Sequence, residues 1–91
     1  MAEPARRVRV TGRVQGVFFR AWTQQQAREL GVGGWVRNAA DGSVEAHLEG
    51  DEAAVKALIQ RLNEGPPAAV VDAVAVEEVR PNGLSSFEVR H

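Results

Sequence analysis

Cysteine is absent from this 91-residue chain, and this absence removes several kinds of chemistry at once. Without a thiol the chain forms no disulfide, no thiolate metal site and no cysteine nucleophile. The sequence also lacks a long apolar run and the apolar segment of a secretory signal, so we predict a cytoplasmic protein that does not enter a membrane. Any catalysis must therefore use oxygen, nitrogen or water as the attacking group.

An excess of either charge is missing too, because 11 basic residues stand against 12 acidic ones. Proteins that bind nucleic acid usually carry a clear basic surplus, so we expect no nucleic-acid partner. The length predicts one small domain over residues 1–91, with residues 1–5 as a flexible tail. No exposed apolar stripe is evident in the sequence, and we therefore expect a monomer.

Apolar periodicity divides the chain into strands and helices. Alternation predicts strands over 6–13, 35–38, 43–48, 70–79 and 87–90, and helical spacing predicts helices over 21–30 and 52–63. Gly31 is a natural end for the first helix, Asp51 a natural N-cap for the second, and Asp41-Gly42 a hairpin turn. The order is βαββαβ plus a terminal strand. It predicts an α+β fold of the ferredoxin-like split βαβ type, with two helices on one face of a mostly antiparallel sheet.

The stretch Gly12-Arg13-Val14-Gln15-Gly16-Val17-Phe18-Phe19-Arg20 joins the first strand to the first helix. A loop that leads into a helix N-terminus directs several backbone N–H groups to one place, where the helix dipole adds positive potential. An arginine beside those amides favours a tetrahedral dianion such as phosphate. Taken alone, the two glycines are more often ordinary turn residues and the arginine a solvated one.

The same stretch resembles the first sequence signature of the acylphosphatases. A second signature is matched by Gly34-Trp35-Val36-Arg37-Asn38, followed by Gly42-Ser43-Val44 and Gly50. The resemblance extends from about Val8 to Arg90 and implies a hydrolase that cleaves acyl phosphates to a carboxylate and inorganic phosphate, without a metal or other cofactor. It implies that Arg20 clamps the phosphate and that Asn38 positions the attacking water. The implied phosphate-binding residues are Arg13, Val14, Gln15, Gly16, Val17, Phe18, Phe19 and Arg20.

The chemistry of acyl phosphates is compatible with such a simple site. Their leaving group is a carboxylate with a pKa near that of Glu, about 4, so it departs as an anion without a general acid. A loose phosphoryl-transfer transition state also asks little of a general base. Charge stabilisation and positioning then suffice. Inorganic phosphate and sulfate are the expected competitors for the pocket.

Other polar and aromatic residues are assigned structural roles. Asp41 is expected in the turn, His47 on the surface, and Trp22 and Trp35 in packing contacts. Four glutamates are expected on solvated strand faces: Glu45, Glu49, Glu77 and Glu78. We also expect the last strand to lie beside the first, which would bring the carboxylate of His91 near Arg20.

Two alternative functions stay open on the sequence alone. One is a nucleic-acid-binding domain on the same scaffold, although the first strand supplies Arg7 and Arg9 without an aromatic residue. The other is a non-catalytic, acylphosphatase-like module of a larger carbamoyl-transfer protein. The sequence ends at His91, which favours a free-standing enzyme as our expectation.

Overall fold

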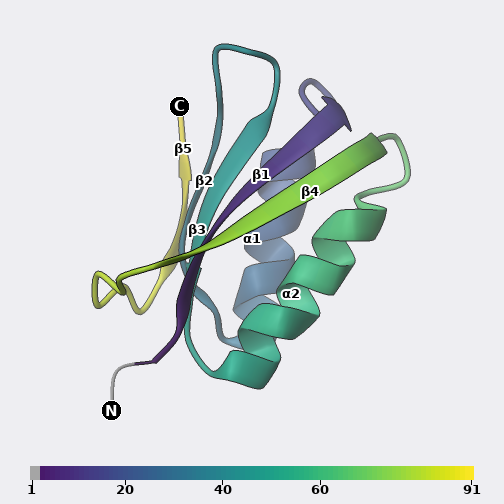
Figure 1. The fold of residues 1–91 in the computed structure, drawn as a ribbon. Helices are drawn as coiled ribbons and strands as arrows, with labels where there is room; N and C mark the ends of the chain where they lie inside the picture. The colour runs from purple at the N-terminus through teal and green to yellow at the C-terminus, as the bar shows by residue number, and fades with distance from the viewer. Residues whose placement is uncertain (1–2) are drawn as a thin grey trace.

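A computed structural model describes residues 3–91 and shows two helices against a five-stranded sheet (Figure 1). The elements are β1 (Ala5–Arg13), α1 (Phe19–Leu30), β2 (Gly33–Asn38), β3 (Val44–Glu49), α2 (Glu52–Glu64), β4 (Val70–Val79) and β5 (Phe87–Arg90). The predicted element order is confirmed. Ala5 already belongs to β1 and is buried, so it is not part of a tail. Residues 1–2 of the predicted tail lie outside the described residues.

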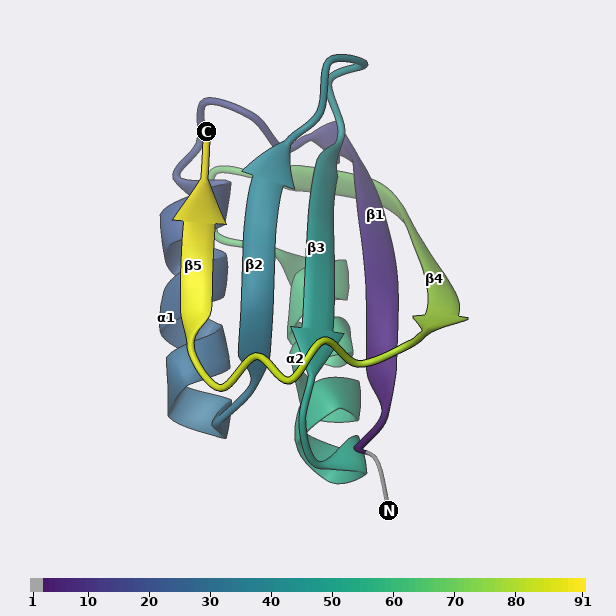
Figure 2. The same ribbon diagram turned by 90° about the vertical axis from the view of Figure 1, so that its left-hand side faces the viewer.

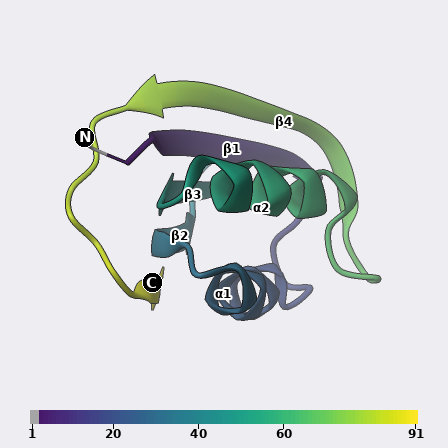
Figure 3. The same cartoon turned by 90° about the horizontal axis from the view of Figure 1, so that it is seen from below.

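The sheet has the strand order β4-β1-β3-β2-β5. All neighbouring strands are antiparallel except β2 and β5, which are parallel. Both helices cover the same face (Figure 3), as expected for the ferredoxin-like arrangement. The expectation that the last strand lies beside the first is wrong, because β3 and β4 occupy the two edges of β1 and leave the free edge of β2 for β5.

The core lies between the helices and the sheet. Each helix buries one stripe of residues, centred on Phe19 and Ala27 in α1 and on Leu58 and Leu62 in α2. The sheet contributes alternate positions of its inner strands, namely Val8, Val10, Val36, Val44, Ala46 and Leu48. Removing these side chains from water is the main favourable term that holds the two layers together.

Two predicted helix ends, Asp51 before α2 and Gly31 after α1, are confirmed by their caps. Asp51 accepts a hydrogen bond from the N–H of Ala53 at 3.2 Å, which satisfies one of the free donors at the start of α2. Gly31 closes α1 in the left-handed conformation, with φ 72°. Helix α1 begins at Phe19, two residues before the predicted start, and its N-cap is Phe18.

The sheet face that the helices leave open is more buried than the sequence predicted. His47, Glu45 and Glu49 have exposed fractions of 1%, 8% and 4%, so their assignment to solvent was wrong. All three lie on β3, the middle strand, where long side chains of the neighbouring strands cover them. The His47 ring stacks on Trp35, and the guanidinium of Arg7 lies 4.9 Å from the centroid of that indole. Glu77 and Glu78, on the edge strand β4, are exposed as expected.

The β4–β5 connection, residues 80–86, also covers part of this face (Figure 2). Glu49 holds the connection by accepting the backbone N–H groups of Asn82 and Leu84, and its carboxylate lies 2.7 Å from His47 Nε2. Burial raises the pKa of Glu49, but these donors more than offset the effect and leave it below the usual value near 4.5. Among residues 3–91, no helix is long and apolar enough to cross a membrane.

Candidate active site

The loop between β1 and α1 has the backbone pattern of an anion-binding concavity. Gly16 has φ 74° and Phe18 has φ 60°, both in the left-handed region, whereas φ is negative at Gln15 and Val17. Such an alternation of backbone hand turns successive N–H groups toward one side. The conformation is natural for glycine but costs a phenylalanine about 1–3 kcal/mol.

Apolar residues fix both ends of this loop in the core. Val14, directly after β1, has an exposed fraction of 1%, and Phe19, the first residue of α1, has 2%. Val17 packs against the same core from the middle of the loop. The first turn of α1 is closed by a hydrogen bond from the N–H of Trp22 to the carbonyl of Phe18, at 2.9 Å. The loop is therefore clamped between two rigid elements.

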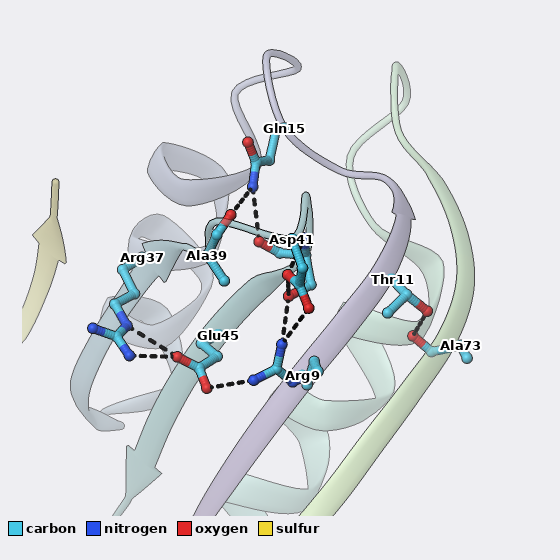
Figure 4. A network of polar contacts seen from close by, with 9 residues as sticks. Arg9, Thr11, Gln15, Arg37, Ala39, Asp41, Glu45 and Ala73 are labelled. Atoms are coloured by element: carbon cyan, nitrogen blue, oxygen red, sulfur yellow. Dashed lines mark hydrogen bonds and ion pairs between the residues drawn. The ribbon is translucent and has the colours of Figure 1, made fainter.

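Gln15 ties the loop to the β2–β3 hairpin (Figure 4). Its Nε2 donates to the carbonyl oxygens of Ala39 and Ser43, each at 2.9 Å. Asn38 is the last residue of β2, directly before Ala39, and is paired with Val44. One side chain thus sets the position of the strand end that carries Asn38 relative to the loop.

The hairpin is also joined to β1 by a network of charged groups (Figure 4). Arg9 donates to Asp41 at 2.8 Å and to Glu45 at 2.9 Å. The hydroxyl and N–H of Ser43 hold the pKa of Asp41 below its usual value, and the bond from Arg37 does the same for Glu45 despite its burial. Asp41 thus belongs to the turn, as the sequence predicted.

Arg20 lies in the first turn of α1 and reaches toward the end of β5. Its Nη1 donates to the carbonyl oxygen of Arg90 and to Nδ1 of His91, each at 3.0 Å. The sequence led us to expect the His91 carboxylate here. The structure instead brings the backbone and the imidazole ring, and among residues 3–91 it shows no ion pair between Arg20 and a carboxylate. The proximity arises because β5 pairs with β2, not with β1.

A cavity of about 350 Å³ brings the predicted site residues together. Arg20 and Asn38 both line it, although they come from different elements. The full lining consists of Val14, Gly16, Phe18, Phe19, Arg20, Ala21, Asn38, Val89 and His91. Arg13, Gln15 and Val17, which were predicted to bind phosphate, do not line it. Ala21 and Val89 were missed, since nothing in their local sequence marks them.

With this geometry established, comparison with known proteins identifies the family. The acylphosphatase family model matches residues 6–89. The chain is 55% identical over 92 residues to an acylphosphatase of Anaeromyxobacter dehalogenans, covering 99% of both chains. The chain belongs to the acylphosphatase family. An acylphosphatase structure from Coxiella burnetii agrees with a TM-score of 0.93 at 42% identity, covering 98% of this chain and 94% of that one.

These acylphosphatase relatives bear on the two alternatives left open by the sequence. The structure of full-length HypF in its phosphate- and nucleotide-bound form also contains this fold, with a TM-score of 0.91 and 30% identity. The match covers 98% of this chain but only 12% of HypF, whereas the Anaeromyxobacter acylphosphatase is matched over nearly its whole length. The comparisons support acyl phosphate hydrolysis and favour neither a non-catalytic module nor a nucleic-acid-binding domain.

Proposed function

We propose that the protein hydrolyses the carboxyl–phosphate anhydride of acyl phosphates by direct attack of water, with Arg20 and Asn38 as the catalytic residues. The observation that carries this proposal is the cavity that Arg20 and Asn38 share with the loop between β1 and α1. Family membership supports the reaction, and the arrangement of the loop supports the assignment of the roles.

The loop and Arg20 bind the phosphoryl group in this proposal. Backbone N–H groups of residues 14–19 and the N-terminus of α1 supply fixed dipoles. Arg20 adds a full positive charge in a planar fork that matches two phosphate oxygens. Because these donors are held in place before the substrate arrives, they stabilise the charge of the transition state without rearrangement.

Asn38 positions the nucleophilic water in this proposal. Its amide both accepts and donates hydrogen bonds, so it can orient a water molecule without removing its proton. Such a group suffices when the transition state is loose and the carboxylate leaves readily. The water attacks phosphorus and the P–O bond to the acyl group breaks, so the products are a carboxylate and dihydrogen phosphate, which carries both protons of the water. The chain has no cysteine that would form a phosphoenzyme instead.

The remaining parts of the proposal follow from the same arrangement. The positive charge that a metal ion often supplies to phosphate is assigned here to Arg20 and the loop amides, so turnover needs no metal. Inorganic phosphate and sulfate compete for the site because it recognises a tetrahedral anion. We further propose a monomer that works in the cytoplasm.

Turnover of benzoyl phosphate tests the proposal directly. The purified protein should release benzoate and phosphate with and without excess EDTA, and inorganic phosphate should inhibit competitively. An alkyl phosphate should be a very poor substrate, because its alkoxide leaving group needs a general acid. Loss of turnover on chelation with recovery on adding a divalent ion, or equal rates on the two substrates, would contradict the mechanism.

A further inference from the structure

Phe18 has an unusual position for a phenylalanine. Its exposed fraction is 86%, the highest among the large hydrophobic residues exposed within residues 3–91. The other two, Val70 and Val76, lie on the edge strand β4, where β-branched residues suit the extended backbone. Phe18 belongs to neither a helix nor a strand, and it is not part of the hydrophobic core or of the half-buried layer around it.

The backbone at Phe18 makes the choice of phenylalanine more unexpected. Its backbone is in the left-handed conformation, with φ 60° and ψ 23°. Phe18 is the N-cap residue of α1, but its side chain makes no capping hydrogen bond to that helix. Asparagine would adopt this conformation with less strain. Folding therefore gives no reason for an aromatic ring here, and exposure, backbone strain and the missing cap all oppose one.

The cavity that contains Arg20 and Asn38 suggests a function for the Phe18 ring. Phe18 lines it together with Ala21, which is exposed, and Val89, which is half-buried. Arg20 and the loop residue Gly16 line the same cavity, so an apolar wall stands beside the groups that are proposed to bind the anion. An acyl phosphate has these two parts, an anionic phosphoryl end and an acyl end of variable chemistry.

We propose that Phe18 is a specificity-determining residue that packs its ring against the acyl group and favours apolar, above all aromatic, acyl phosphates over small ones. This inference rests on the proposed function of the cavity. An aromatic ring offers a large, rigid contact surface, and it prefers another ring in an edge-to-face or offset arrangement. In this proposal the backbone of Phe18 belongs to the loop that binds the anion, while its side chain contacts the acyl group.

The ratio of kcat/KM for benzoyl phosphate to that for acetyl phosphate tests the inference. Phe18→Asn keeps a residue that tolerates the left-handed backbone but removes the ring, and it should lower the ratio about fivefold. Phe18→Tyr keeps the ring and should keep the ratio. Val76→Asn, which replaces an exposed apolar residue on β4, is the matched control and should also keep it. The inhibition constant of inorganic phosphate, measured on each variant, reports the state of the loop itself.

The outcomes separate this inference from the proposed function. A Phe18→Asn protein that loses activity equally on both substrates would overturn the inference, because the ring would then serve the loop and not the acyl group. An unchanged ratio at unchanged activity would overturn it as well. If the wild-type protein hydrolysed neither acyl phosphate, the proposed function would fail first and the role of Phe18 would fail with it.

Discussion

At the scale of single residues, Arg20 and Asn38 should fail in different ways when they are changed. Arg20 is proposed to contact the anion in both the ground state and the transition state. Arg20→Gln should therefore weaken inhibition by phosphate and reduce kcat by roughly 10³, the size of effect seen when a charge-stabilising donor is lost. Arg20→Lys should not restore activity, because a compact ammonium does not reproduce the two-pronged contact.

Asn38 is proposed to contact the water and not the anion. Asn38→Ala should leave the inhibition constant of phosphate nearly unchanged while kcat falls by about 10², as expected for an interaction felt mainly in the transition state. Single-turnover rates and phosphate inhibition, measured on both variants, separate the two roles. Arg28→Gln is the control for loss of a positive charge from the same helix, because Arg28 is an exposed arginine in the last turn of α1. Equal losses of phosphate affinity in Arg20→Gln and Asn38→Ala would refute the assignment.

The proximity of Arg20 and Asn38 was easier to predict from the sequence than the contacts of the open sheet face. Arg20 and Asn38 stand in two long motifs, and the structure brings them to one cavity. His47 and Glu49 were misplaced because a single strand's alternation shows only which face a side chain takes. It does not show that Trp35, Arg7 and the connection 80–86 cover that face. These contacts join residues far apart in the sequence.

At the scale of elements, Gln15 should couple the loop to the hairpin. Gln15→Ala removes two hydrogen bonds to the carbonyl oxygens of Ala39 and Ser43. Each such bond contributes about 1 kcal/mol. The free energy of unfolding should fall by about 1–2 kcal/mol. We expect kcat to fall about tenfold or more, because Asn38 loses its fixed distance from the loop and small displacements are costly in a positioned site.

The matched control for this coupling is Asn63→Ala. Asn63 also donates from a side-chain amide to a backbone carbonyl, that of Ile59 at 2.9 Å, but it lies on α2. Both variants should be assayed well below their unfolding temperatures, so that a loss of stability does not appear as a loss of rate. If Gln15→Ala reduced kcat no more than Asn63→Ala, the loop and the hairpin would not be coupled through Gln15.

The elements themselves followed closely from the sequence, and the exceptions have physical reasons. The start of α1 was placed too late because its N-cap, Phe18, is not one of the polar residues that usually mark a helix start. The strand predicted to pair with β5 was wrong, because hydrophobic periodicity does not encode the order of strands in a sheet. That order depends on the path of residues 80–86, which Glu49 holds through two backbone N–H groups.

At the scale of the whole molecule, the sheet is stabilised differently on its two faces. The helix side is an apolar core, whereas the open side buries carboxylates that pair with half-exposed guanidinium groups and backbone donors. Arg9 and Arg37 flank Glu45, while His47 and two backbone donors satisfy Glu49. A buried carboxylate is tolerated only with such partners, so this face should make the stability of the fold depend on pH.

The direction of that dependence follows from the lowered pKa values of Glu45 and Glu49. As the pH falls below about 4.5, the unfolded chain takes up protons on these carboxyl groups before the folded protein does. Their stabilising contribution is therefore complete above that pH and is lost as the pH falls through the lower folded values. Urea midpoints measured between pH 3 and pH 7 should decrease steeply on the acidic side.

Glu49→Gln tests whether the open face is the source of this acid sensitivity. The variant removes the titrating group and places an amide where the N–H groups of Asn82 and Leu84 need a carboxylate. The free energy of unfolding at pH 7 should thus fall by about 1–3 kcal/mol. The difference from wild type should then shrink as the pH falls below about 4.5, because protonation of the unfolded wild-type chain progressively removes the stabilising contribution of the carboxylate. Glu64→Gln, at the exposed end of α2, is the control. A Glu49→Gln curve parallel to the wild-type curve over the whole range would show that acid sensitivity arises elsewhere in the protein.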